Sequence, residues 1–101
     1  MLKHIIMWDH LDGLSPEEKT QNAALVKATL EKLVGIIPGL LELQVYTELV
    51  KESSNAEVVL YSVFASPEAL LVYQDHPAHV QAATEVVRPR MTNRRCADFL
   101  V

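Results

Sequence analysis

The sequence predicts an α+β sandwich in which a four-stranded antiparallel sheet carries helices on one face. Two serine-proline pairs, Ser15-Pro16 and Ser66-Pro67, mark helix starts, because serine caps a helix and proline suits its first position. Four apolar segments without helical spacing surround these helices and are predicted to be strands. The resulting order, β-α-β-β-α-β, is that of a split, ferredoxin-like fold.

The first half of the chain predicts a strand, a helix and a second strand. Residues 2–9 are bulky and extended, and Ser15 with Glu18 then forms a capping box. The helix carries one apolar stripe at spacings of three and four: Ala23, Val26, Leu30, Leu33 and Ile37. Gly35, Pro38 and Gly39 end this helix. Residues 40–50 form the next strand, whose apolar side is predicted to hold Leu41, Leu43, Val45 and Leu49.

The second half predicts a hairpin, a broken helix and a last strand. Residues 51–56 are a polar turn, so the strand at 57–64 pairs with the preceding strand. The helix that follows Ser66 runs to about Tyr73, and Pro77 forces a break before a second helical stretch. Residues 93–101 form the final strand. No linker or repeat interrupts this order, so we expect a single domain over residues 1–101.

The first strand is apolar on both sides. Ile5 and Met7 point one way, while Ile6 and Trp8, in line with His4, point the other. Two helices can cover only one face of a four-stranded antiparallel sheet, so the other apolar face would remain in water. We therefore expect a homodimer in which a second copy of the sheet covers this face.

Composition argues against several functional classes. The net charge of −4 disfavours nucleic-acid binding, and Arg88, Arg90, Arg94 and Arg95 are interpreted as a solvated helix end and turn rather than an anion site. No apolar run approaches the roughly 20 residues that cross a bilayer, and no signal-peptide pattern is present, so no membrane partner is expected. The single cysteine, Cys96, excludes an intrachain disulfide and favours a cytoplasmic location.

Residues 73–80 concentrate the groups that could do chemistry. His76 is predicted to cap the helix that begins at Pro77, and His79 lies in its first turn. The partial positive charge of a helix N-terminus favours the neutral, proton-accepting imidazole there, which suits a general base. A structural hydrogen bond across the break is an equal alternative for His79. Tyr73 is interpreted as a packed aromatic with a satisfied hydroxyl unless it faces the same cavity as His79.

No metal or other cofactor is expected. His4, His76 and His79 would supply three nitrogen ligands for zinc, but their spacing across a proline-broken helix start does not suit one ion. Cys96 lies in a predicted strand far in sequence from any histidine, which argues against nucleophilic catalysis. No glycine-rich phosphate loop is present, so a nucleotide is not supported. Asp98, in the last strand, either holds a histidine tautomer or is solvated.

Over nearly its whole length the chain resembles the stress-responsive A/B barrel domain family. The resemblance rests on three segments: Lys3-His4-Ile5-Ile6, Ile36-Ile37-Pro38-Gly39-Leu40, and Tyr73-Gln74-Asp75-His76-Pro77-Ala78-His79-Val80. It implies a ferredoxin-like monomer that dimerises through its sheet as a dimeric α/β barrel. For most members of the family it implies no established reaction.

The family that the chain resembles has enzymatic relatives, the plant polyketide cyclases of the olivetolic acid cyclase type, which promote an aldol condensation. The resemblance implies that His79 is the base and that Tyr73 hydrogen-bonds the enolate oxygen, while His4 orients it. The expected substrate site is completed by Ile6, Trp8, His76 and Asp98. These residues predict cofactor-free cyclase or isomerase chemistry on a small carbonyl compound. The alternative is a non-catalytic dimeric domain that is stress-associated or binds small apolar ligands.

Overall fold

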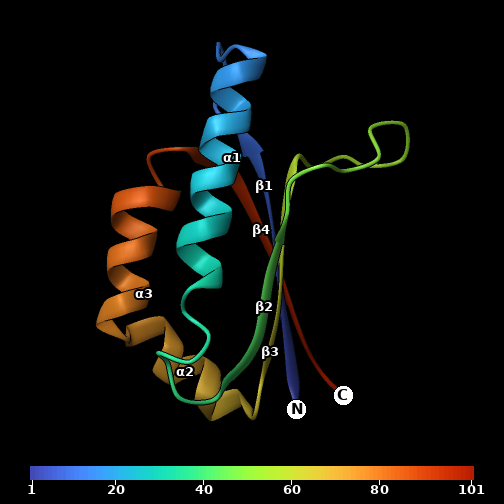
Figure 1. Cartoon of the computed structure of the whole chain (residues 1–101). Coiled ribbons are helices and arrows are strands. Elements are labelled where there is room, and N and C mark those ends of the chain that lie inside the picture. The colour runs from blue at the N-terminus through green and yellow to red at the C-terminus, as the bar shows by residue number, and fades with distance from the viewer.

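Four strands form one antiparallel sheet, and the helices lie on one of its faces (Figure 1). The computed structural model describes residues 1–101. The elements in chain order are β1 (Leu2–His10), α1 (Pro16–Glu31), β2 (Leu40–Tyr46), β3 (Val58–Phe64), α2 (Pro67–Asp75), α3 (Pro77–Ala82), a π-helical turn (Ala83–Val87) and β4 (Met91–Leu100). The strand order is β2-β3-β1-β4 with antiparallel neighbours. This confirms the predicted ferredoxin-like fold. None of the helices is long and apolar enough to cross a membrane.

The start of α1 agrees with the sequence and its end does not. Glu18 donates its backbone N–H to Ser15 Oγ and accepts the Ser15 N–H, which completes the predicted capping box. The regular helix ends at Glu31, before the predicted stop at Gly35. Tight turns continue from there, with the N–H of Ile37 donated to the carbonyl of Leu33 at 3.1 Å. The predicted apolar stripe is nonetheless buried along its whole length.

β2 is shorter than the sequence predicts, and its buried side carries different residues from those predicted. A β-bulge between Leu40 and Glu42 shifts its register against β3, so Leu40 is buried and Leu41 is 52% exposed. The prediction that Leu41 lies on the apolar side is therefore wrong. The strand ends at Tyr46, and residues 47–57, here called the arm, extend away from the sheet before β3 begins (Figure 1).

The hydrophobic core lies between the sheet and the helices. Along β1 every second side chain is buried toward the helices: Leu2, His4, Ile6, Trp8 and His10. Phe64, from β3, has no exposed surface and forms part of the same core. His10 also belongs to this buried row, because β1 continues one residue beyond the predicted strand end at residue 9.

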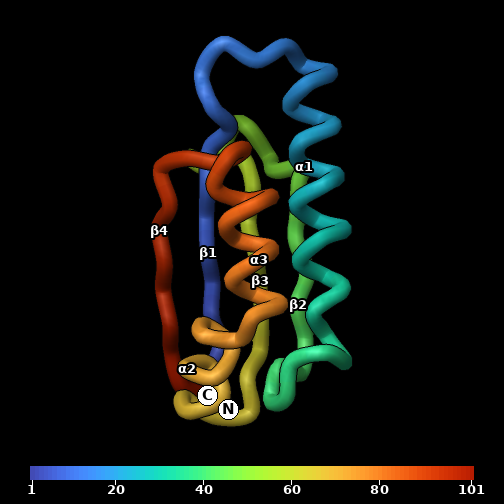
Figure 2. Tube along the Cα trace, turned by 90° about the vertical axis from the view of Figure 1, so that its left-hand side faces the viewer, coloured from blue at the N-terminus to red at the C-terminus, as the bar shows by residue number.

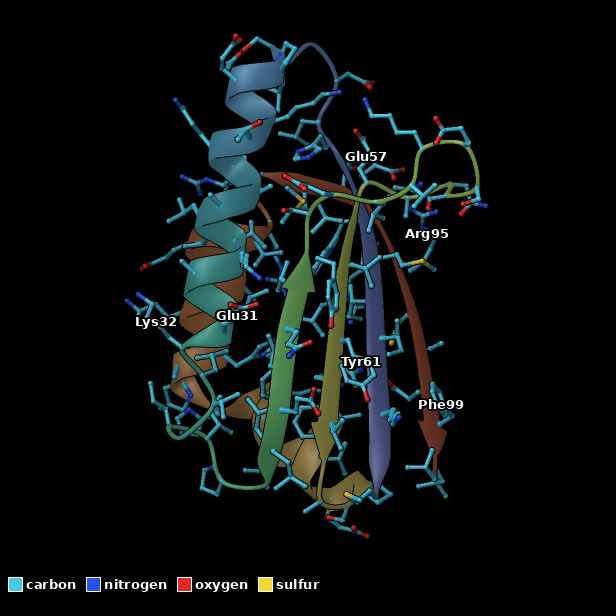
Figure 3. The ribbon with its side chains drawn as sticks, turned by 45° about the vertical axis from the view of Figure 1, so that its right-hand side comes forward. Glu31, Lys32, Glu57, Tyr61, Arg95 and Phe99 are labelled. Atoms are coloured by element: carbon cyan, nitrogen blue, oxygen red, sulfur yellow. The ribbon has the colours of Figure 1, made fainter.

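The opposite face of the sheet carries no helix. Tyr61, Arg95 and Phe99 lie on this open face, from β3 and β4 (Figure 3). Ile5 and Met7 of β1 also lie on this face and are half-buried within the single chain. The first strand is thus apolar on both sides, as its alternation predicts.

β4 is the edge strand beside β1, and α1 and α3 leave it uncovered (Figure 2). Met91 is its one buried residue. Asp98 is paired with His4, and Cys96 is paired with Ile6. Because directly opposed residues of an antiparallel pair project to the same side, Asp98 and Cys96 face the helix side of the sheet. The pairing places the first strand of the chain, β1, directly beside the last strand, β4.

Candidate functional site

The break between α2 and α3 is built by His76 and Pro77. His76 has an extended backbone (φ −66°, ψ 133°), and its Nδ1 accepts the backbone N–H of Ala78 at 3.1 Å. This bond satisfies one of the donors that a helix start leaves free. The predicted cap is therefore confirmed. One ring nitrogen of His76 is thereby engaged with the backbone.

Four aromatic rings from four elements lie next to one another beside this break. Phe64 of β3 contacts Tyr73 of α2 edge to face, with ring centroids 5.0 Å apart. His4 of β1 lies 6.0 Å from Phe64 and 6.5 Å from Tyr73. His79 of α3 lies closest to Tyr73, at 4.2 Å between centroids. Three predicted site residues, His4, Tyr73 and His79, are thus brought together by the fold.

The His79 ring is held by one nitrogen. Its Nδ1 lies 3.2 Å from the carbonyl oxygen of Gln74, across the helix break. Since a carbonyl only accepts, Nδ1 carries the proton and Nε2 keeps its lone pair in the neutral ring. Burial lowers the pKa of His79, the Gln74 carbonyl opposes that shift, and the nearby side chains of His4, Arg88 and Arg94 add to it. The neutral, proton-accepting form is favoured.

The Tyr73 hydroxyl has no protein partner, although the residue is only 2% exposed. The one buried side-chain nitrogen or oxygen that lacks a partner is Nδ1 of His10, so the Tyr73 oxygen must reach solvent-accessible space. The sequence predicted a hydrogen-bonded Tyr73 hydroxyl, and the structure shows no such bond within the protein. Burial raises the pKa of Tyr73 well above its ordinary value, with Arg94 opposing the shift. The phenol consequently stays protonated and available as a donor.

His4 meets two side chains of β4. Its Nδ1 contacts Asp98 Oδ1, and Cys96 Sγ lies 3.8 Å from the same nitrogen. Asp98 therefore contacts a histidine, one of the two roles that the sequence left open. Cys96 is far from His4 in the sequence and adjacent to it in space, which sequence reasoning missed. Burial and the Asp98 charge raise the pKa of the Cys96 thiol, which does not favour a nucleophilic role.

The remaining predicted site residues lie in the core. Ile6 and Trp8 are 2% and 6% exposed and pack in the main hydrophobic cluster on the helix side of β1. They follow His4 along the same face of the strand. Their role as lining of a substrate site stays a prediction.

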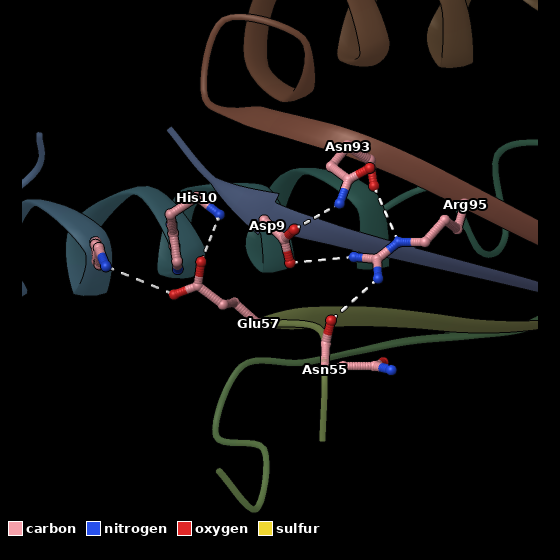
Figure 4. A network of polar contacts seen from close by, with 7 residues as sticks. Asp9, His10, Asn55, Glu57, Asn93 and Arg95 are labelled. Atoms are coloured by element: carbon pink, nitrogen blue, oxygen red, sulfur yellow. Dashed lines mark hydrogen bonds and ion pairs between the residues drawn. The ribbon is translucent and has the colours of Figure 1, made fainter. Parts of the chain in front are cut away.

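A large groove, of about 1040 Å³, lies elsewhere, between α1 and the arm. His10 lies in its wall, and Nδ1 of this ring has no partner. Close by, Glu57 accepts the His10 backbone N–H at 3.1 Å and lies 3.6 Å from Lys19 Nζ (Figure 4). No local pattern in the sequence indicates this cluster, because its members come from separate elements.

A second set of contacts ties the arm to the end of the sheet. Arg95 donates to Asp9 Oδ1 at 3.1 Å and to the carbonyl of Asn55 at 3.0 Å (Figure 4). Asn93, which adopts a left-handed backbone (φ 54°), donates to the other Asp9 oxygen at 2.8 Å. Arg90 donates to the carbonyl of Val86 at 3.1 Å. Of the four arginines between residues 88 and 95, Arg90 and Arg95 therefore donate hydrogen bonds within the protein.

Comparison with protein families and solved structures agrees with this geometry. The family model "Stress responsive A/B Barrel Domain" matches residues 2–101. No curated protein sequence matches the chain significantly. A dimeric protein of unknown function and ferredoxin-like fold from Bacteroides fragilis is 25% identical, with a TM-score of 0.88 over 99% of this chain and 95% of that one.

Two further structures share the fold at lower identity. A Dabb family protein with a ferredoxin-like fold from Mesorhizobium loti is 17% identical, covering 99% of this chain and 95% of that one with a TM-score of 0.75. A hydroxynitrile lyase from Passiflora edulis is 19% identical, covering 99% and 92% with a TM-score of 0.77. The family match over almost every residue shows that this chain belongs to the stress responsive A/B barrel domain family.

Proposed function

We propose that this chain forms a homodimer and that a small pocket beside Tyr73 and His79 binds a carbonyl compound. The pocket catalyses cofactor-free proton transfer at a carbon next to the carbonyl, leading to enolisation, isomerisation or aldol-type cyclisation. One observation carries the proposal: adjacent rings of Tyr73 and His79 present an unpartnered phenol and an unpartnered imidazole nitrogen. These are the donor and acceptor that such a reaction needs.

The proposed step balances without a further reagent. Nε2 of His79 takes the proton from a carbon between two carbonyls, and the C–H electrons move onto a carbonyl oxygen. Tyr73 donates a hydrogen bond to that oxygen as negative charge develops on it. In isomerisation the imidazolium returns its proton to another carbon or to the oxygen. In cyclisation the carbanion forms a bond to a second carbonyl carbon, whose oxygen receives the proton.

His4 is proposed as a positioning residue. Its Nδ1 is held by Asp98, so its Nε2 is left to accept from the Tyr73 hydroxyl or from the ligand. We propose Ile6 and Trp8 as apolar walls, and His76 as part of the entrance at the helix break.

The dimer interface in this proposal is the open face of the sheet. Several apolar residues lie on that face, with Phe99 46% exposed and Val63 of β3 also directed to this side. The similar protein from Bacteroides fragilis is described as dimeric. Burial of this face against a second copy stabilises the sheet that carries His4 and Asp98.

Deuterium exchange at the acidic carbon of 1,3-dicarbonyl compounds tests the proposal directly. NMR would follow a panel of such compounds with purified protein, in a buffer whose own exchange rate is measured separately. His79→Ala is expected to reduce the protein-dependent rate by about 10²–10⁴-fold, the usual contribution of a general base. Gln81→Ala is the matched control, because Gln81 is an exposed residue of the same helix and has no role in the proposed site. A wild-type rate equal to that of buffer for the whole panel contradicts the proposal.

A non-catalytic domain is the second candidate, and one bond favours it. His79 Nδ1 bonds the Gln74 carbonyl across the helix break, which is also what a purely structural histidine would do. On this alternative, His79→Ala lowers the melting temperature markedly, and neither form binds or exchanges any compound of the panel. The two candidates therefore differ in the ligand measurements and not only in stability.

A further inference from the structure

Beside the Tyr73–His79 pair, three donor atoms of different chemistry lie together at the edge of the sheet. Cys96 Sγ lies 3.8 Å from His4 Nδ1 and 3.6 Å from Asp98 Oδ1, and the same nitrogen and oxygen are in contact. All three donors lie within 4.8 Å of one another. An imidazole nitrogen, a thiol sulfur and a carboxylate oxygen are the donor types that zinc binds in proteins.

The backbone holds these donors in place. β1 and β4 are hydrogen-bonded neighbours, with Asp98 opposite His4 and Cys96 opposite Ile6. All three side chains therefore project from the same side of two paired strands, the side that faces the helices. A site built on strands is held more precisely than one on loops.

The separations suit a single tetrahedral ion. Zinc bonds of about 2.3 Å to sulfur and about 2.0 Å to nitrogen or oxygen place such donors about 3.5 Å apart. Both distances from Cys96 are close to this value. Nδ1 and Oδ1 must separate to share an ion, and the Asp98 side chain, which is 36% exposed, has room to turn.

We propose that His4, Cys96 and Asp98 form a zinc site with three protein ligands and a fourth position for water. The exposed thiol of Cys96 gives the ion access from solvent. On binding, the thiol proton is released to solvent, and the thiolate and the carboxylate together balance the two charges of the ion. The fourth position is typical of zinc sites that take part in chemistry rather than in folding alone.

This site does not rest on the proposed function, because its donors include neither Tyr73 nor His79. The two are linked through His4 and its partner Asp98. An ion that takes Nδ1 of His4 displaces its contact with Asp98 and changes what holds the His4 ring, the positioning residue of the proposed function. Zinc is therefore expected to alter the rate of carbon–hydrogen exchange, and that effect requires Cys96.

Metal titration of tag-free, reduced and chelator-treated protein tests the site. Zn²⁺ would be added in competition with a chromophoric chelator, and Co²⁺ would be used as a spectroscopic substitute. The expected result is one ion per chain, with a thiolate-to-cobalt charge-transfer band in the near ultraviolet. Cys96→Ser should weaken Zn²⁺ binding at least about tenfold and remove that band. Asp75→Asn, which removes an exposed carboxylate elsewhere, should change neither.

Equal Zn²⁺ affinity of wild type and Cys96→Ser, or a Co²⁺ spectrum without the thiolate band, overturns the zinc site. Failure of this proposal and failure of the proposed function remain separable. His79→Ala should keep full Zn²⁺ affinity while it loses exchange, so the loss of one property without the other identifies the proposal that fails. Circular dichroism of each variant confirms that the comparison is between folded proteins.

Discussion

Gly39 and Ala69 touch where the turn before β2 passes the first turn of α2. A Cβ added to Gly39 would lie 2.6 Å from the Cβ of Ala69, and the Gly39 backbone is left-handed (φ 81°). No side chain larger than hydrogen fits without a shift of the backbone. This approach fixes the start of α2, the helix that carries Tyr73.

Replacement of Gly39 by alanine should be costlier than the same change at Gly35. Both residues have positive φ, and that conformation costs an alanine about 1 kcal/mol or somewhat more. A Cβ at Gly35 meets nothing within 4 Å, so Gly35→Ala measures the backbone term alone. We expect Gly39→Ala to lose a further 1–3 kcal/mol, roughly the cost of overpacking, in urea denaturation. Equal losses of stability in the two variants would show that α2 shifts to accommodate the added methyl group.

Removal of the Tyr73 hydroxyl should separate stability from chemistry. Because this hydroxyl bonds no protein group, Tyr73→Phe breaks no hydrogen bond within the chain and keeps the ring contacts. The free energy of unfolding should change by less than about 0.5 kcal/mol. The protein-dependent exchange rate should fall about 10²-fold or more, as for loss of one donor to an oxyanion. A large loss of stability would mean that the hydroxyl is structural.

Protonation of His79 should make the protein less stable in mild acid. The pKa of His79 is lowered from its ordinary value of 6.5, chiefly by burial. Below pH 6.5 the unfolded chain binds a proton at this histidine, whereas the folded chain binds it only near its lower native pKa. The contribution of His79 to the free energy of unfolding is therefore fully present above pH 6.5 and is lost as the pH falls through the native pKa. The pKa of His10 is lowered in the same direction. Urea denaturation between about pH 8 and about pH 5 should show a shallower decline for His79→Gln, with His10 intact.

A charge on the open face should separate the proposed dimer. Tyr61 lies on that face with Lys3 Nζ 5.3 Å from its ring centre. Tyr61→Glu places a carboxylate where a second sheet would pack, and an unpaired buried charge is strongly unfavourable. Light scattering should report monomers for this variant. Leu25→Glu, on the outward side of α1 and 41% exposed in the wild type, should leave the dimer intact.

The features that the sequence predicted well are those with local causes. The capping box at Ser15 and the break at His76-Pro77 depend on neighbours within four residues, and both formed as expected. The bulge that exposes Leu41 depends on pairing with β3, which no local pattern records. No local pattern indicates the early end of α1 either, because the tight turns that follow it bury the apolar stripe as well as a longer helix would.

The candidate site divides in the same way. Tyr73 and His79 are six positions apart on two short helices, so their contact follows from the motif and its broken backbone. The meeting of His4 with Cys96 depends on which strands are neighbours. Long separation in the sequence suggested that Cys96 was remote, and the antiparallel pairing of the end strands made it adjacent. The free Tyr73 hydroxyl could not be foreseen, because hydrogen bonding depends on all surrounding side chains.

The pairing of β1 with β4 also has a kinetic consequence. His4 and Asp98 are 94 residues apart, so their contact closes a loop of nearly the entire chain. Entropy opposes early closure of so long a loop, and non-local strand pairs form slowly. The β2–β3 hairpin and the helices should therefore acquire protection from hydrogen exchange first. During refolding the reactive cluster is expected to be the last part of the molecule to assemble.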